Sequence, residues 1–457
     1  ELRLNRRFAP ELYVDVCAIS TAADGLACVS GAGDEDEPSE YAVKMHQFCR
    51  DDELDNLLAA GHIEPAELAA FGTALARIHQ QLPVARPPAK WGDPDAVCAA
   101  IWRNFSECEQ ASAVFSTGAS VNALRPGLAR CLEAAAPWMA ERREAGRVRE
   151  CHGDLHAGNL VRLSSRLVAF DCLEFEPAFR WIDVADEIAF LAMDLEAQAR
   201  PQHSQAFLSA YLSQGGDYQA GRVLRAYTAH RALVRAKVQA LNVTTSQAPD
   251  EHERARARYL SYLTCAGKVL AADGTLLLMS GLSGSGKTWL ASRLAPRLGA
   301  VHIRSDLERK RLVELEPDAR TQSGLGAGLY SGEMSARVYT HLVEAAAHIL
   351  AGGRSVIVDA TFARREHRTL FEDLAVRLGV SACLIHCQAP AEVLIARVRA
   401  RHDERKDASE ADPAVLGWQR ERWEPLGGPE RWNTVDVDTT APDLEDVLRR
   451  IDRCRRI

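Results

Sequence analysis

The pattern of hydrophobic and polar positions divides the chain near residue 272. Before that point, residues Pro65–Gln81 and 222–241 place apolar side chains three and four positions apart, which predicts amphipathic helices. Short apolar runs at 12–19, 41–48 and 167–170 predict strands between such helices. We therefore expect a mostly helical N-terminal part.

Beyond residue 274 the pattern changes to short apolar strands that alternate with helical stretches. The strands are predicted at Thr275–Ser280, 301–303, 355–358, 382–387 and 434–437. Such alternation is typical of an α/β fold, a parallel sheet with helices on both faces. We expect two domains, over residues 1–271 and 272–457, and a loop at the polar stretch 244–253.

The composition narrows the class of protein. The length of 457 residues predicts two or three domains, and 47% hydrophobic with 26% charged residues indicates a folded chain rather than a disordered or fibrous one. No apolar run has the length of a membrane span, and the first ten residues are charged, unlike a secretion signal. We expect a soluble, cytoplasmic protein without a membrane partner. Because the chain begins with Glu1 rather than Met, we also expect a fragment or a processed product.

Charge and cysteine content exclude further classes. The 55 Lys and Arg against 63 Asp and Glu give a net charge of -8, so no overall basic field favours nucleic acid as a partner. The 12 cysteines contain no CxxC pair, and neither a disulfide framework nor a zinc site is expected. We interpret them as ordinary buried thiols of a reducing compartment.

The strand Thr275–Ser280 leads into a phosphate-binding loop. The following residues match GxxxxGK[ST], with Gly281, Ser283, Gly284, Ser285, Gly286, Lys287 and Thr288. Glycines let successive backbone N–H groups point at phosphate oxygens, and the helix expected at 289–298 adds positive potential. We expect Lys287 to bridge the terminal phosphates of ATP, with GTP as the alternative, and the Thr288 hydroxyl to bind Mg²⁺.

Two carboxylates follow later strands of this half. Asp306 comes at the end of the second strand, where open parallel sheets hold their ligands, and can accept a proton from an attacking hydroxyl. The alternative is a cap for the helix expected at 307–313. Asp359 ends the third strand and is the expected acid for Mg²⁺, directly or through water, with a capping role as the alternative.

Arginines are the third feature of the C-terminal half. Arg397 and Arg401 are four residues apart on a predicted helix, so both are expected to face a polyphosphate when a mobile segment closes. A solvated charged face is the alternative. Arg364, Arg365 and Arg368 are candidates for the acceptor pocket, and a surface helix is equally compatible with them.

These motifs resemble the P-loop kinases that include polynucleotide 5'-kinases, gluconate kinase and chloramphenicol phosphotransferase. The resemblance lies in Gly281 to Thr288, 304–306, 356–362 and 397–401. In that group the carboxylate that matches Asp306 serves as general base, and the arginine region resembles the lid. The resemblance implies phosphoryl transfer to a hydroxyl, whereas the acceptor differs widely among members.

The helical half contains a second set of phosphotransfer residues. His152, Asp154 and Asn159 form HxDxxxxN, and Asp171 follows 17 residues after Asp154 at a predicted strand end. This is the catalytic-loop and metal-loop spacing of the protein-kinase-like fold. Asp154 would orient the acceptor hydroxyl and take its proton, Asn159 would hold Mg²⁺, and Asp171 would bridge metal and phosphates. A polar turn with local hydrogen bonds is the alternative.

The run His152-Gly-Asp-Leu-His-Ala-Gly-Asn159 resembles the characteristic loop of the aminoglycoside phosphotransferase family. With the other half, the chain is similar to bacterial two-domain proteins that fuse such a domain to a P-loop kinase. In the family, a strand lysine and a helix glutamate complete the ATP clamp. Residues 1–7 resemble that helix, which leaves Lys44 too late in the chain for the lysine. Either residues upstream of this numbering supply it, or the domain lacks half its clamp.

These features together predict an ATP-dependent, Mg²⁺-dependent kinase that is bifunctional and phosphorylates a hydroxyl of a small molecule. A polynucleotide 5'-hydroxyl kinase or a nucleotide-sugar kinase is the alternative within the same class. A different class also fits, a switch in which ATP occupancy changes how the two halves pack. The sequence names neither the acceptor nor the oligomeric state.

Overall fold

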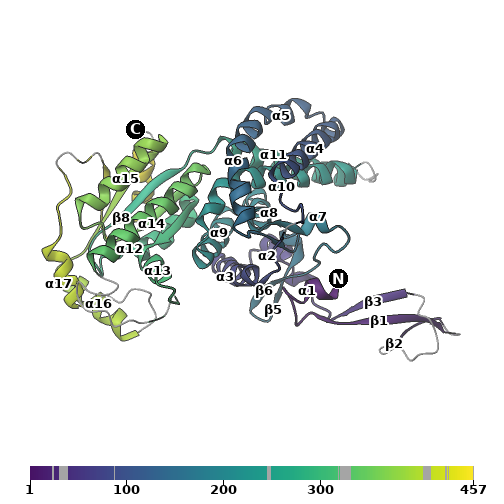
Figure 1. Cartoon of the computed structure of the whole chain (residues 1–457), viewed down its shortest axis with the longest axis horizontal. Helices are drawn as coiled ribbons and strands as arrows, with labels where there is room; N and C mark the ends of the chain where they lie inside the picture. Colours follow the sequence, from purple (N-terminus) through teal and green to yellow (C-terminus); the bar gives the residue numbers. More distant parts are fainter. Residues whose placement is uncertain are drawn as a thin grey trace. The chain divides into compact units, whose positions relative to one another are not determined.

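The computed structural model describes residues 1–22, 25–29, 40–86, 88–243, 249–316, 319, 331–404, 413–427, 430 and 432–455. The chain forms two compact units (Figure 1). Unit 1 comprises Glu1–Phe207 and Ala226–Gly267, and unit 2 comprises Leu208–Arg225 and Lys268–Ile457. Unit 2 thus includes a short segment from the middle of the helical half.

Unit 1 begins with a short helix and an antiparallel sheet. Helix α1 (Leu2–Asn5) precedes β1 (Tyr13–Ala22), β2 (Gly25–Val29) and β3 (Glu40–Met45), which pair in the order β2-β1-β3. The apolar runs at 12–19 and 41–48 therefore correspond to β1 and β3. Strand β2, which begins with Gly25, was not predicted, since glycine is depleted in strands.

The remaining strands of residues 1–271 form two small antiparallel pairs. Strand β4 (Val148–Glu150) pairs with β7 (Trp181–Asp183), and β5 (Leu160–Leu163) forms a hairpin with β6 (Arg166–Ala169). The run predicted at 167–170 corresponds to β6. Strands β4 and β7 have three residues each, too few for a periodic signal.

Helices make up most of residues 1–271, as predicted. They are α2 (Leu54–Ala60), α3 (Pro65–Gln81), α4 (Pro94–Ala111), α5 (Gly118–Asn122), α6 (Arg125–Glu144), α7 (Pro177–Arg180), α8 (Val184–Ala197), α9 (Pro201–Gly215), α10 (Gly221–Val243) and α11 (Pro249–Ala271). Short 3-10 turns are η1 (Arg50–Asp52), η2 (Ser112–Phe115), η3 (Ala157–Asn159) and η4 (Tyr218–Ala220). Helix α8 is buried from Val184 to Leu195, which makes it the centre of this core.

The polar stretch 244–253 differs from its prediction. Residues 244–248 lie outside the described part, but the structure starts α11 at Pro249 and continues the helix through residue 253. Proline suits the first turn of a helix, and Asp250 and Glu251 favour its positive end. Residues 249–253, which we expected in a loop, therefore form the start of a helix.

Unit 2 contains a parallel sheet of five strands in the order β12-β11-β8-β10-β9. The strands are β8 (Thr275–Ser280), β9 (Ala300–Arg304), β10 (Ser355–Asp359), β11 (Ser381–Gln388) and β12 (Asn433–Asp438). Each matches a predicted strand. The register pairs Asp359 with Met279 and with Arg304, so the carboxyl ends of β8, β9 and β10 meet at one edge of the sheet.

Helices cover both faces of this sheet, as expected. They are α12 (Lys287–Leu298), α13 (Ser305–Arg311), α14 (Gly332–Ala351), α15 (Arg365–Leu378), α16 (Ala391–Glu404), α17 (Pro413–Glu421) and α18 (Leu444–Cys454). Apolar residues of α12 and α18 pack with Leu277 and Met279 in one core cluster. Helix α14 contacts β8, β9 and β10, while α15 contacts β11.

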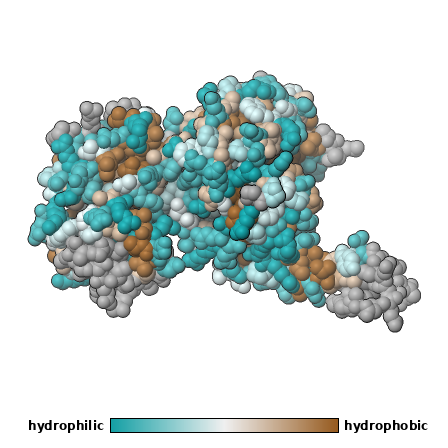
Figure 2. Space-filling view, in the orientation of Figure 1, coloured by the Kyte–Doolittle hydropathy of each residue, from teal (hydrophilic) through white to brown (hydrophobic). Residues whose placement is uncertain are grey.

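Among the helices of the described residues, none combines the length and the apolar character needed to cross a bilayer. The face drawn in Figure 2 is mostly hydrophilic, with smaller hydrophobic areas between. Large exposed apolar side chains include Phe175 and Phe179, whose ring centroids lie 6.4 Å apart, and Val376 on α15.

Candidate active sites

The phosphate-binding loop lies between β8 and α12, where the sequence predicted it. Gly281 and Gly284 have φ of +144° and +81°, a backbone conformation that side chains other than glycine rarely adopt. A Cβ at Gly284 would lie 2.7 Å from the backbone oxygen of Leu394, and one at Gly281 would collide with that of Cys387. Close packing against β11 and α16 therefore requires glycine at both positions.

Lys287 opens α12 and lines a cavity next to the loop. Its Nζ donates a hydrogen bond to the backbone oxygen of Leu282 at 2.9 Å. Burial lowers the pKa of Lys287, and the nearby carboxylates of Asp359 and Asp306 oppose this shift. Burial disfavours the charged form of Lys287, and a bound phosphate would stabilise that form. Lys287 is therefore suited to bind an anion.

Asp359 lies at the end of β10 beside Thr288. The Thr288 hydroxyl donates a hydrogen bond to this carboxylate, and Nε2 of His302 lies 3.2 Å from its Oδ2. Burial alone would raise the pKa of Asp359, but His302, Lys287 and Thr288 outweigh it and set the pKa at about 2. An ionised carboxylate beside a hydroxyl is a donor set that fits Mg²⁺, which takes oxygen ligands.

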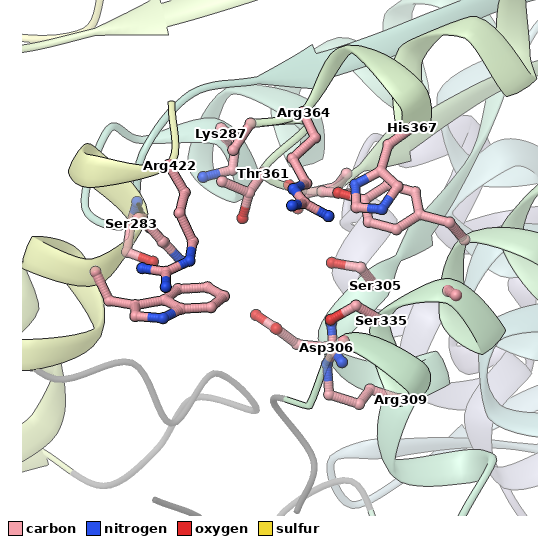
Figure 3. Close-up of a pocket in the computed structure, with 18 of the residues that line it drawn as sticks. Ser283, Lys287, Ser305, Asp306, Arg309, Ser335, Thr361, Arg364, His367 and Arg422 are labelled. Atoms are coloured by element: carbon pink, nitrogen blue, oxygen red, sulfur yellow. Dashed lines mark hydrogen bonds between the residues drawn. The ribbon is translucent and has the colours of Figure 1, made fainter. Parts of the chain in front are cut away.

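Asp306 and Lys287 line the same cavity of about 300 Å³ (Figure 3). Asp306 lies in the first turn of α13, and Arg304 rather than Asp306 occupies the N-cap position. Thr288, Asp359 and Arg401 also line this cavity. The structure thus brings together five residues that the sequence suggested from four separate segments.

Arg397 and Arg401 have different surroundings, although they are one helical turn apart. The Arg397 guanidinium donates to the backbone oxygen of Gly284 at 3.3 Å and to Oγ1 and the backbone oxygen of Thr439 at 2.9 Å each. Arg401 lines the cavity, whereas Arg397 is not among the lining residues. Arg397 therefore fastens the phosphate-binding loop to the segment after β12. Residues 405–412 of the expected lid lie outside the described part.

The three arginines after β10 also separate. Arg364 lines the cavity, while Arg365 is exposed and Arg368 is fully buried. Arg368 forms an ion pair of 2.7 Å with Glu430 and donates to the backbone oxygen of Phe362 at 2.9 Å. Of these three arginines, Arg364 is the one that lines the cavity.

A buried carboxylate outside the predicted set fixes the helix that carries Asp306. Glu308 accepts a hydrogen bond from the Tyr218 hydroxyl at 2.7 Å and from Nε of Arg311 at 3.0 Å, and Nε2 of His341 lies 3.0 Å from it. Burial would raise the pKa of Glu308, but these partners lower it. Tyr218 is 90 residues from Glu308 in the chain, so no local pattern could have shown this contact.

The second set of predicted residues meets in unit 1. Nδ2 of Asn159 donates to the Asp154 carboxylate at 3.1 Å and to its backbone oxygen at 3.0 Å, and Nε2 of His156 lies 3.5 Å from the same carboxylate. Burial would raise the pKa of Asp154, but His156, His152 and Arg231 outweigh it and set the pKa at about 2. Asp154 is therefore ionised and oriented.

His152 connects this loop to the residue after β6. Its Nε2 lies 2.8 Å from the backbone oxygen of Phe170, which can only accept, so the proton is on Nε2. Nδ1 then accepts from the Asp154 N–H at 3.4 Å. Burial lowers the pKa of His152 to about 4, which keeps the ring neutral and this arrangement intact.

Asp171 follows Phe170 with a φ of +65°. Its N–H donates to the Tyr13 hydroxyl at 3.0 Å, and the N–H of Cys172 donates to Oδ1 of Asn5 on α1 at 2.8 Å. Burial, then the charges of Glu174 and Asp154, raise the pKa of Asp171. A divalent cation beside Asp171 would relieve this repulsion, and Asn159 could add an amide oxygen, so the donor set fits Mg²⁺.

Glu187 on α8 holds the start of the loop His152–Asn159 in place, a role that the sequence did not predict. Its two carboxylate oxygens accept the N–H groups of His152 at 2.6 Å and Gly153 at 2.9 Å. Burial raises the pKa of Glu187 to about 7, although these two hydrogen bonds oppose the shift. Ligand atoms of His79, Cys151 and Glu187 also lie within 4.8 Å of one another. Because both Glu187 oxygens already hold backbone N–H groups, we assign it to loop support rather than to a metal.

Replacing Glu187 with alanine is expected to lower the free energy of unfolding of unit 1 by about 2–4 kcal/mol, since two buried N–H groups lose their acceptor. Differential scanning calorimetry measures the change. Glu174→Ala is the control, because Glu174 is an exposed glutamate. If both variants unfold like the wild type, Glu187 does not hold the loop.

Comparison with known proteins identifies both parts of the chain. Residues 54–226 match the model of the Phosphotransferase enzyme family, and residues 276–426 match the model described as AAA domain. An uncharacterized protein of Mycobacterium tuberculosis is 28% identical over 424 residues, 93% of this chain and 82% of the relative. The solved gluconokinase of Sinorhizobium meliloti is 21% identical over 40% of this chain and 94% of its own, with a TM-score of 0.28. The solved ethanolamine kinase of Plasmodium vivax is 12% identical over 44% of this chain and 59% of its own, with a TM-score of 0.30.

The two family matches confirm the resemblances drawn from the motifs. The chain carries a kinase-like phosphotransferase domain in its N-terminal part and a P-loop kinase domain in its C-terminal part. The protein is therefore an ATP-dependent kinase.

Proposed function

Because the chain joins a kinase-like phosphotransferase domain to a P-loop kinase domain, we propose that the P-loop domain transfers the γ-phosphoryl group of ATP to a hydroxyl of a small molecule. The observation that carries this proposal is the shared cavity, in which Lys287 of the phosphate loop, the pair Thr288 and Asp359, and Asp306 all participate. Its volume of about 300 Å³ suits a small acceptor rather than a folded partner.

Magnesium, when bound, neutralises charge on the β- and γ-phosphates. Thr288 and Asp359 are the residues that would hold it, since Asp359 is ionised and its hydrogen bond to Thr288 keeps the two oxygens adjacent. Lys287 would bind the terminal phosphates from the loop side. These residues position the γ-phosphoryl group, which is the larger part of catalysis in this type of reaction.

The acceptor would lie between Asp306 and the γ-phosphoryl group. Asp306 takes the proton of the acceptor hydroxyl as its oxygen forms a bond to the γ-phosphorus. The bond between that phosphorus and the β,γ-bridging oxygen breaks, and ADP leaves. Arg401, which also lines the cavity, stabilises the charge that develops on the transferred group.

The N-terminal domain would contribute a second kinase-like site around Asp154, Asn159 and Asp171. Support comes from the ionised Asp154, held by Asn159, and from the oxygen donors near Asp171. Lys44, on β3 opposite Asp15, is exposed and is proposed as a structural residue rather than a phosphate ligand. We therefore assign the main turnover to the P-loop domain.

The test is transfer of label from γ-labelled ATP with Mg²⁺ to a small-metabolite extract, an aminoglycoside panel and a 5'-hydroxyl oligonucleotide. We expect a labelled small product that persists in Asp154→Ala, because the P-loop site has its own base and phosphate ligands. Asp95→Ala, an exposed change on α4, is the matched control. Loss of the product in Asp154→Ala alone would move the activity to the N-terminal domain. Label on the oligonucleotide would favour a polynucleotide kinase, and no label would favour the nucleotide-dependent switch.

A further inference from the structure

A glutamine of α17 contacts the phosphate-binding loop. The N–H of Ser283, the third residue of that loop, donates a hydrogen bond to Oε1 of Gln419 at 2.9 Å. A backbone N–H can only donate, so the amide oxygen of Gln419 faces the loop and its amino group is directed elsewhere. The two residues are 136 positions apart in the chain, so no local pattern in the sequence indicates this contact.

Packing on both sides of Gln419 fixes its position. Leu416, three residues earlier on α17, is buried in an apolar cluster with residues of α16, and Leu282 of the phosphate-binding loop packs against this cluster. Beyond the helix, the N–H of Glu424 donates to the backbone oxygen of Ala363 at 2.8 Å. The backbone around Gln419 is therefore attached to the phosphate-binding loop before it and to the residues after β10 behind it.

The amino group of Gln419 is available to a ligand. Gln419 lines the cavity that also contains Lys287 and Asp306. Among the residues that the structure describes, Ser283 is the hydrogen-bond partner of the Gln419 side chain, and it contacts the oxygen alone. Nε2 of Gln419 is not one of the buried polar atoms that lack a partner, so it is accessible from outside the protein. Gln419 thus offers two N–H donors, with the amide oriented by the loop.

Gln419 lies on the side of the cavity that takes the phosphates. In Figure 3, Ser283, Lys287 and Arg422 are grouped in one part of the cavity, and Asp306 lies in another. The N–H of Arg422 donates to the backbone oxygen of Gln419 at 3.3 Å, so both side chains start from the same turn of the chain. A phosphoryl group held between the loop and Asp306 would therefore meet the Gln419 amide as well as Lys287.

We infer that Gln419 binds the γ-phosphoryl group of ATP and positions it for transfer, with its oxygen held by the Ser283 N–H and its amino group donating to a phosphoryl oxygen. The amide is neutral, so it adds direction to the contact that the charge of Lys287 provides. Because ADP lacks the γ-phosphoryl group, the contact also favours ATP over ADP. The inference rests on the proposed function, which places the γ-phosphoryl group at this loop.

The first test is a binding measurement that needs no acceptor. Dissociation constants of AMP-PNP and of ADP, each with Mg²⁺, are measured by isothermal calorimetry for the wild type and Gln419→Glu. Glutamate keeps an oxygen for the Ser283 N–H, but it loses the amino group and places a negative charge beside the phosphates. We expect the ratio of the AMP-PNP constant to the ADP constant to rise at least about tenfold, since repulsion replaces a hydrogen bond to a charged group.

Arg420→Gln is the matched control for this measurement. Arg420 is exposed on the same helix and does not line the cavity, so the variant should keep the wild-type ratio. Gln419→Ala is a second variant that adds no charge, and it should also weaken AMP-PNP binding more than ADP binding.

The outcomes separate the inference from a supporting role and from the proposed function. If Gln419 only fastens α17 to the loop, Gln419→Glu keeps that hydrogen bond and binds both nucleotides like the wild type, which overturns the inference alone. An equal loss of AMP-PNP and ADP binding in Gln419→Ala overturns it as well. A wild-type protein that binds neither nucleotide overturns the proposed function and the inference with it.

The second test follows the phosphoryl group itself. Transfer of label from γ-labelled ATP to the metabolite extract is measured at saturating ATP. We expect kcat in Gln419→Glu to be at least about tenfold lower than in the wild type, because the lost hydrogen bond strengthens as charge develops on the transferred group. Arg420→Gln should keep the wild-type rate. An unchanged kcat in Gln419→Glu would exclude Gln419 from the positioning of the γ-phosphoryl group.

Discussion

Replacing Lys287 with alanine is expected to reduce phosphoryl transfer by the C-terminal domain at least about 10³-fold, because the variant loses the charge that stabilises the transferring phosphoryl group in a site shielded from water. The reduction should appear in kcat as well as in kcat/KM, since the charge on these oxygens grows in the transition state. Transfer of label from γ-labelled ATP to the acceptor measures it.

Arg293→Ala is the control for Lys287→Ala. Arg293 lies on the exposed side of the same helix, where its guanidinium stacks over Trp289 at 4.0 Å, and it does not line the cavity. It should therefore keep the wild-type rate. If Lys287→Ala is folded by circular dichroism and still transfers label at full rate, the phosphate loop is not the catalytic centre.

The sequence predicted those parts of the two sites that depend on residues close to one another along the chain. The loop from Gly281 to Thr288 needs glycines and a lysine at fixed spacing, and the loop from His152 to Asn159 needs its acid and amide five residues apart, so short motifs identify both. Strands β8 and β10 of the parallel sheet were also predictable, because both of their faces are buried and their sequences are mostly apolar.

The supporting contacts could not be predicted because they join distant segments. Glu187 holds the amides of His152 and Gly153 across 35 and 34 residues, and Tyr218 meets Glu308 across 90. Helical periodicity alone gave Arg397 and Arg401 the same role. In the structure, Arg397 instead donates hydrogen bonds to Thr439, which follows the last strand, and these contacts give Arg397 a structural role.

Asp306→Asn is expected to lower kcat about 10²- to 10⁴-fold while the KM for ATP stays unchanged. Asparagine keeps the size of the side chain but cannot take the proton of the acceptor hydroxyl. The nucleotide contacts of Lys287, Thr288 and Asp359 are untouched by this change. Rapid-quench measurement of the first turnover should show the loss directly, because it isolates chemistry from product release.

Glu316→Gln is the charge-matched control for Asp306→Asn, since Glu316 is exposed beyond the end of α13 and does not line the cavity. Equal first-turnover rates in the two variants would exclude Asp306 as the base. A higher KM for the acceptor with an unchanged kcat would instead make Asp306 a binding residue, because a general base acts only in the transition state.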